Sequence, residues 1–203
     1  MSKVFLDLGI NVVNLDIVPS PCLYFGVHDL DLPSGLMITA SHNPIQYNGI
    51  KFYMRDRIFT SEDIMQIYDN IATKPNSIVP GVKKGIFRKQ DIRKNYINFT
   101  LKNIKINPEL KIVWDCGGGA MAQIIQEVVR LLPNINYILN GVLDARFASR
   151  DPDPTKLESV RGISNFIKAN QYDFGFSYDG DGDRVIVIDS EGSKIPGDKL
   201  LGI

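Results

Sequence analysis

Between residues 110 and 189 the chain alternates short apolar strands with helical segments, and this order limits the folds open to it. Helices are predicted over 120–132 and 156–169, and the second carries apolar residues at spacings of three. Strands rich in aliphatic and aromatic residues are predicted at 110–115, 135–139, 172–178 and 184–189, the last forming a hairpin with 193–195. Strand–helix–strand order implies parallel pairing with right-handed crossovers, so the predicted fold class is α/β.

The first part of the chain predicts a second, smaller unit of strands and helices. Residues 2–8 predict the end of a helix that stops at Gly9. Ser20 followed by Pro21 predicts an N-cap and a first-turn proline, and Thr60 with Asp63 opens another helix. The expected elements are strands at 11–18, 36–40 and 50–54 and helices at 20–30 and 61–72.

A stretch with two prolines and two glycines, residues 74–88, predicts a connection between these two units. Helical periodicity resumes at 90–103, and residues 197–203 predict the start of a last helix. We therefore expect two domains, residues 1–88 and residues 89–203.

Composition excludes several classes of protein. Lysine and arginine number 23, as do aspartate and glutamate, and a net charge of zero argues against binding nucleic acid. No stretch reaches the roughly 18–20 apolar residues of a membrane span, and the N-terminus is too short and too acidic for a signal peptide. The two cysteines, Cys22 and Cys116, fit a reducing compartment, so a cytoplasmic protein is expected.

The run Asp179-Gly180-Asp181-Gly182-Asp183-Arg184 is the strongest sign of chemistry. Three carboxylates on a loop that glycine lets fold tightly can gather around one Mg²⁺ ion. An EF-hand does not fit, because Arg184 would take the place of its turn glycine and Ser190 that of its bidentate glutamate. A solvated acidic turn is the remaining alternative, but Arg184 beside the third carboxylate favours a phosphate next to a metal.

A second candidate lies in TASHNP, residues 39–44, which follows a predicted strand. Here Ser41 could carry a phosphoryl group, with His42 and Lys51 handling protons or phosphate charge nearby. A polar turn is the alternative, although YNGIK at 47–51 makes it less favoured. A Ser-His-Asp hydrolase fits less well, because no G-x-S-x-G elbow is present.

Three other features have simpler interpretations. CGGGA at 116–120 could be an anion nest, but a tight turn with close helix–strand packing is favoured. His28 is expected to be a structural histidine, and Trp114 to lie in the core.

The order of these motifs resembles the α-D-phosphohexomutase family, most closely its phosphomannomutase/phosphoglucomutase branch. DPDP at 151–154 and YNGIK favour that branch over the glucosamine branch. The matching pieces are VPSPCLYFGV, GLMITASHNPIQYNGIKFY, IVWDCGGGA, DPDPTKLESV and FSYDGDGDRV.

The resemblance implies an isomerase that interconverts hexose 6-phosphate and hexose 1-phosphate through a phosphoserine and a bisphosphate intermediate. Ser41 would be the phosphoserine, His42 and Lys51 would assist proton transfer, and Arg184 would contact phosphate. One Mg²⁺ would be bound by Asp179, Asp181 and Asp183 together with the phosphate on Ser41. Hexose 1,6-bisphosphate would be the activator and a phosphosugar the substrate, with mannose and glucose both open.

The resemblance also implies a fold of two three-layer α/β/α units with mixed, mostly parallel sheets. Family members have four domains, and this chain would hold the later part of the first and most of the second. A complementing chain could supply the other parts. Two departures from the family pattern are Gly118, where asparagine is usual, and Arg150, which stands in a stretch that usually contains histidine.

Two other functions stay open. The chain could be a catalytically inactive fragment that retains Mg²⁺ and phosphate binding. It could also be a phosphoserine-bearing module that regulates a partner, although the sequence contains no partner-binding motif.

Overall fold

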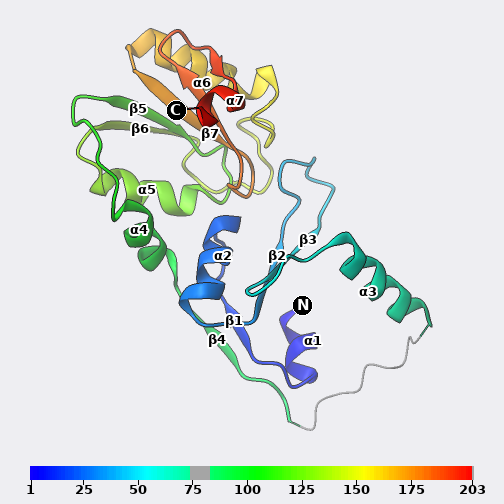
Figure 1. Ribbon diagram of the computed structural model, residues 1–203. Coiled ribbons are helices and arrows are strands. Elements are labelled where there is room, and N and C mark those ends of the chain that lie inside the picture. Colours follow the sequence, from blue (N-terminus) through cyan, green and yellow to red (C-terminus); the bar gives the residue numbers. More distant parts are fainter. Residues whose placement is uncertain (74–82, 203) are drawn as a thin grey trace.

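A computed structural model describes residues 1–73 and 83–202 and shows two groups of elements, one around a five-stranded sheet and one around two strand pairs (Figure 1). Among the described residues, no helix combines the length and the apolar character that crossing a membrane requires.

The five-stranded sheet lies in the second half of the chain. Its order is β6-β5-β7-β8-β9, with β5 parallel to both β6 and β7. The strand β8 is antiparallel to both of its neighbours, β7 and β9. The predicted parallel pairing and the predicted hairpin are therefore both confirmed. The strands are β5 (Lys111–Asp115), β6 (Ile135–Leu139), β7 (Phe174–Tyr178), β8 (Val185–Asp189) and β9 (Lys194–Ile195).

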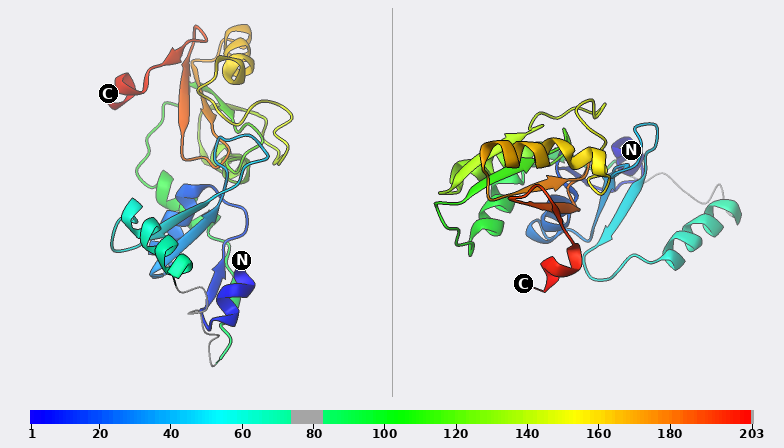
Figure 2. Two further views of the ribbon diagram at one scale, coloured as in Figure 1. Left: turned by 90° about the vertical axis from the view of Figure 1, so that its right-hand side faces the viewer. Right: turned by 90° about the horizontal axis from the view of Figure 1, so that it is seen from above.

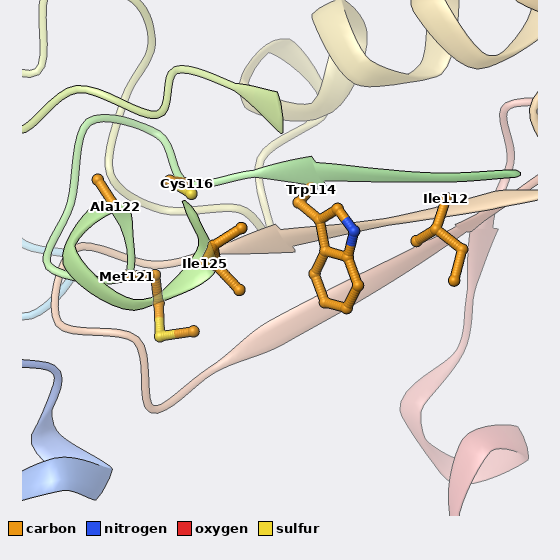
Figure 3. Close-up of a cluster of buried hydrophobic side chains, with 6 residues drawn as sticks. All are labelled: Ile112, Trp114, Cys116, Met121, Ala122 and Ile125. Carbon is orange, nitrogen blue, oxygen red and sulfur yellow. The ribbon is translucent and has the colours of Figure 1, made fainter. Parts of the chain in front are cut away.

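Helices cover both faces of this sheet. Successive side chains of β5 point to opposite faces, so apolar residues of this strand contact a helix on each side. Ile112 and Trp114 point to one face, where they pack with residues at the start of α5 (Ala122–Leu131), as Figure 3 shows. Val113 points to the other face and packs against α6 (Leu157–Asn170). This group is therefore a three-layer α/β/α unit, and Trp114 lies in its core as expected.

The strands of the first half form two separate pairs rather than one sheet. β2 (Ser34–Ile38) and β3 (Ile50–Met54) are antiparallel, and α2 (Ser20–Asp29) packs against β2. β1 (Val12–Asn14) pairs in parallel with β4 (Phe87–Lys89) and contacts α1 (Ser2–Asp7). With both parallel and antiparallel pairs, the chain has the expected mixed α/β class.

Two predictions about these strands were wrong. The strand expected at 11–18 ends at Asn14, because Asp16 turns the chain with φ of 63° and donates its N–H to the Asn14 side chain. The connection expected at 74–88 ends in β4, which the β1 partner stabilises; residues 74–82 lie outside the described residues.

The helix α3 (Ser61–Thr73) begins as predicted. The N–H of Thr60 donates to the Asp63 carboxylate at 2.8 Å, and the Thr60 hydroxyl meets the N–H of Asp63 at 3.5 Å. Of the described residues, none in α3 is buried, and the helix stands away from the other elements (Figures 1 and 2).

A shared hydrophobic cluster joins the two groups. Val18 and Cys22 pack with Ile92 and with Ile97 of α4 (Arg93–Leu101), and Ile124 of α5 completes the cluster. The strand β4 also spans the expected boundary between residues 88 and 89. The chain ends with a short helix, α7 (Gly197–Leu201).

Candidate functional site

The three aspartates of the acidic loop lie together where β7 ends. One carboxylate oxygen from each of Asp179, Asp181 and Asp183 lies within 4.8 Å of the other two. Asp179 and Asp181 are buried, and Asp183 is exposed. Gly182 makes the turn possible, because its φ is 71° and its N–H donates to the Asp179 carbonyl at 3.2 Å. Folding therefore concentrates negative charge at one point.

The start of α2 holds the middle of this loop. The Ser20 N–H donates to the Asp181 carbonyl oxygen at 2.8 Å, and the Ser20 hydroxyl donates to Asp181 Oδ2 at 2.9 Å. The expectation that Ser20 is the N-cap was wrong: Pro19 occupies the cap position, and Ser20 is the first helical residue. Its hydroxyl has a partner 161 positions away, for which no local sequence signal exists.

The carboxylates are arranged as ligands for a hard cation. Asp181 Oδ1 is buried and has no hydrogen-bond partner in the described part of the chain. A buried carboxylate oxygen without a partner is costly, and a metal ion would satisfy it. Burial is also the main reason that the pKa of Asp179 is raised. An all-oxygen set of this charge fits Mg²⁺.

Lys51 of β3 reaches the same cluster from the other group of elements. Its Nζ lies 2.6 Å from Asp181 Oδ2 and 2.6 Å from Asp183 Oδ2. Burial opposes the charge on Lys51, but hydrogen bonds to the two carboxylates outweigh it and raise the Lys51 pKa. Burial likewise opposes the Asp181 charge, and hydrogen bonds from Lys51 and Ser20 outweigh it and lower the Asp181 pKa.

Ser41 lies against the acidic loop. Its hydroxyl donates to Asp179 Oδ2 at 3.0 Å, and its N–H donates to Thr39 Oγ1 at 2.7 Å. The φ of Ser41 is 54°, in a left-handed region that residues other than glycine rarely occupy. The loop between β2 and β3 reaches across from the first group of elements to the second (Figure 1). Backbone strain of this kind is typical of functional loops.

His42 and Arg184 adjoin the serine. The Ser41 hydroxyl oxygen lies 3.3 Å from His42 Nδ1. Arg184 Nη1 lies 2.9 Å from Nδ1 and 3.2 Å from Nε2 of the same ring, which places the guanidinium group over the ring face. The lone pairs or N–H bonds of the two His42 ring nitrogens point in different directions within the ring plane. A single Arg184 nitrogen that is close to both must therefore lie above that plane. The structure thus brings together every site residue expected from the sequence.

The glycine-rich turn at 116–120 forms a brace for the acidic loop. The Ala120 N–H donates to the Gly180 carbonyl at 2.9 Å, and the Gly118 N–H donates to the Asn140 carbonyl at 2.9 Å. Because these two N–H groups already donate to carbonyl oxygens of the protein, a tight turn explains this segment better than an anion-binding nest does. The other histidine, His28, pairs with the Tyr53 hydroxyl at 2.8 Å and takes no part in the cluster.

Two family models match this chain. The model for phosphoglucomutase/phosphomannomutase alpha/beta/alpha domain I matches residues 1–77, and that for domain II matches residues 91–192. The chain belongs to the phosphoglucomutase/phosphomannomutase family. The resemblance seen in the sequence motifs is therefore confirmed.

Individual members of the phosphoglucomutase/phosphomannomutase family are similar along nearly the whole chain. A phosphomannomutase/phosphoglucomutase of Pseudomonas putida is 32% identical over 98% of this chain and 42% of that protein. A probable phosphoglucosamine mutase of Methanobrevibacter smithii is 34% identical over 98% of this chain and 45% of that protein. The chain thus spans less than half the length of these relatives, which come from both branches.

A solved structure gives the same result. A phosphoglucomutase/phosphomannomutase family protein of Burkholderia thailandensis superposes with a TM-score of 0.87 at 28% identity, covering 97% of this chain and 44% of that one. The arrangement of the two groups of elements is therefore the family's fold.

Proposed function

We propose that this chain carries the phosphoserine and metal loops of a phosphohexomutase that interconverts hexose 6-phosphate and hexose 1-phosphate, with mannose or glucose as the sugar. The observation that carries this proposal is the contact between Ser41 Oγ and Asp179 Oδ2 at 3.0 Å. This contact supports a role for the Ser41 hydroxyl as the acceptor of a phosphoryl group beside the carboxylate cluster. Membership of the family supports the same reaction class.

Ser41 is the proposed phosphoryl carrier. Its Oγ attacks one phosphorus of a hexose 1,6-bisphosphate, a new Oγ–P bond forms, and the bond from that phosphorus to the sugar oxygen breaks. His42, whose Nδ1 lies 3.3 Å from Oγ, accepts the proton that leaves the hydroxyl, and the sugar oxygen takes up a proton. In the exchange itself, phosphorylated Ser41 gives its phosphoryl group to the free hydroxyl of a hexose monophosphate. The phosphoryl group at the other position of the resulting bisphosphate then returns to Ser41 Oγ, and the second monophosphate is released.

Two cations complete the proposed site. Lys51 contacts Asp181 and Asp183, and Arg184 contacts His42. Both can neutralise charge that spreads over the phosphoryl oxygens during transfer.

Asp179, Asp181 and Asp183, with an oxygen of the phosphate on Ser41, would hold one Mg²⁺. Its chemistry would be that of a Lewis acid that stabilises negative charge on the transferring phosphoryl group. The buried, unpartnered Asp181 Oδ1 supports this assignment.

We also propose that a complementing chain supplies the parts needed for turnover. A groove of about 370 Å³ separates β1 from β2 and is lined largely by apolar residues. The neighbouring pair β2–β3 exposes Ile38, Ile50 and Phe52, and α3 exposes Ile64 and Tyr68. Apolar surface of this extent is typical of a site that contacts another protein.

Two further assignments accompany this proposal. Residues 1–88 form a partial first domain with the serine loop, and residues 89–203 form a second domain with the metal loop. A cytoplasmic location is supported by Cys22 and Cys116, which are buried as free thiols.

The test of the carrier assignment is the intact mass of the purified chain after incubation with Mg²⁺ and glucose 1,6-bisphosphate. We expect one added phosphoryl group, located on Ser41 by peptide sequencing and absent from Ser41→Ala. The matched control is Ser190→Ala, which removes an exposed hydroxyl in the β8–β9 turn and should leave labelling unchanged. A folded chain that takes up no phosphate would instead be an inactive fragment, and a label on another residue would overturn the assignment of Ser41.

A further inference from the structure

The Arg150 side chain is buried and contacts the ends of two strands as well as the backbone of its own neighbour, Asp151. Its side chain is 6% exposed, and Nε donates to Asp115 Oδ2 at 2.8 Å. Nη2 donates to the Tyr178 carbonyl oxygen at 2.6 Å, and Nη1 donates to the Asp151 carbonyl oxygen at 2.8 Å. One planar group thus joins the end of β5, the end of β7 and the DPDP segment at 151–154.

The contact with Tyr178 bears directly on the acidic loop, because Tyr178 is the residue before Asp179. A fixed carbonyl at Tyr178 fixes the plane of the peptide that leads into Asp179. Further along the loop, Ala120 donates its N–H to the Gly180 carbonyl and Ser20 donates its N–H to the Asp181 carbonyl. Arg150 therefore holds the entry to the loop, and the glycine turn holds the residue after Asp179.

Asp115 gives Arg150 a rigid anchor. Its carboxylate is buried and also accepts hydrogen bonds from the Gly117 N–H at 3.0 Å, Asn140 Nδ2 at 2.7 Å and Ser177 Oγ at 3.2 Å. A buried charge held by this many donors has little freedom to move.

The glycine turn packs directly against the guanidinium group. A Cβ at Gly117 would lie 2.4 Å from Arg150 Nη2, and the φ of Gly117 is 57°. Any side chain at position 117 would therefore clash with the Arg150 guanidinium group.

We infer that Arg150 is a positioning residue that sets the direction from which the Asp179 carboxylate approaches the metal. The inference rests on the proposed function, because it concerns the loop proposed to bind Mg²⁺. A lysine would keep the positive charge beside Asp115 but could not also reach the Tyr178 and Asp151 carbonyl oxygens as the fork does, because its donors share one nitrogen. The fork shape of arginine, and not its charge alone, holds Tyr178.

The test compares Arg150→Lys with Arg146→Lys by calorimetric titration with Mg²⁺. Arg146 is the matched control, because its side chain is 82% exposed and pairs only with Asp144 in the described structure. We expect both variants to fold, and the Mg²⁺ Kd of Arg150→Lys to rise about 10- to 100-fold, as for other groups that orient metal ligands. A Kd equal to that of the unchanged chain would overturn the inference.

A second readout does not depend on the metal. In the Mg²⁺-free protein we expect amide hydrogen exchange at Asp179 and Gly182 to be faster in Arg150→Lys than in Arg146→Lys. If the unchanged chain binds no Mg²⁺, the proposed metal site fails, and the exchange rates alone decide on Arg150: equal rates would overturn the positioning role.

A third variant applies if Arg150→Lys does not fold. The pair Arg150→Met with Asp115→Asn removes both buried charges, which avoids leaving one of them unpaired. The same titration and exchange measurements then apply. An Mg²⁺ Kd equal to that of the unchanged chain, or exchange rates equal to those of Arg146→Lys, would overturn the positioning role.

Discussion

A Cβ atom on Gly180 would lie 2.3 Å from the carbonyl oxygen of Ser41. Real side chains do not come that close, so glycine at this position lets the serine loop touch the acidic loop. We expect Gly180→Ala to move Ser41 away from Asp179 and to slow phosphorylation of Ser41 by up to about 100-fold, since small displacements of reacting groups have effects of that size. The measurement is the rate of mass increase with glucose 1,6-bisphosphate.

The control for that change is Gly162→Ala. Gly162 lies in α6 and an added Cβ there would meet no atom within 4 Å. Alanine should stabilise the helix by about 0.5–1 kcal/mol and leave phosphorylation unchanged. Equal labelling rates for the two alanine variants would contradict the steric role of Gly180.

Removing the Lys51 ammonium group should lower the stability of the chain but strengthen its binding of Mg²⁺. In EDTA we expect Lys51→Met to lower the free energy of unfolding by about 1–3 kcal/mol, because Asp181 and Asp183 lose a charged hydrogen-bond donor. Mg²⁺ should bind more tightly than to the unchanged chain, because a competing cation is gone. Denaturant unfolding in EDTA and calorimetry with Mg²⁺ measure the two effects.

Lys89→Met is the matched control for Lys51→Met. Lys89 pairs with Asp16 at 3.6 Å on the surface, where such a pair contributes less than about 1 kcal/mol. Mg²⁺ binding that weakens in Lys51→Met would show that the ammonium group assists the metal instead of competing with it.

Asp181→Asn should weaken Mg²⁺ binding at least about 10-fold. The change removes one negative charge and puts an amide NH₂ beside the metal or beside Lys51, and both effects oppose an oxygen-coordinated cation. Calorimetry checks this, with Asp198→Asn as the control, because Asp198 is exposed at the start of α7. Unchanged affinity in Asp181→Asn would remove the acidic loop from the metal site.

The two thiols should make stability fall at high pH. Burial raises the pKa of Cys22 and that of Cys116 from the ordinary 9.0 to about 12. As pH rises from about 9 to about 12, the unfolded chain loses these protons before the folded chain does, so the free energy of unfolding decreases over that window. Denaturant unfolding at pH 8, 9 and 10 measures it, and a flat profile above pH 9 would contradict the prediction.

The same burial predicts slow alkylation. At pH 8, iodoacetamide should label Cys22 and Cys116 at least about 100-fold more slowly in the folded chain than in urea, because the thiolate reacts and burial disfavours it. Rapid labelling of the native chain would show that these thiols are accessible.

Local patterns in the sequence were enough for most of the elements. The strands Ile50–Met54 and Ile135–Leu139 begin and end where the apolar runs do, and the hairpin of β8 and β9 follows from its turn residues. Pairing between distant segments could not be read in this way. The strand β4 exists because Phe87 pairs with Val12, and nothing in three residues of local sequence indicates such a partner.

For the site, spacing and residue type identified the members but not their contacts. The alternating aspartates and the TASHNP loop predicted one cluster, and the structure places Ser41, Lys51 and Asp179–Asp183 together. Neither the bridge that Lys51 makes between two carboxylates nor the bond from Ser20 to Asp181 has a local signal. Each depends on how the two groups of elements meet in space.

The cluster of Val18, Cys22, Ile92, Ile97 and Ile124 has a consequence for any attempt to divide the molecule. The two family models leave a gap between residues 77 and 91, which looks like a natural place to cut the gene. A cut there would separate Val18 and Cys22 from Ile92, Ile97 and Ile124, and so open an apolar surface on both pieces. The two regions that the family models match are therefore not units that fold separately in this protein.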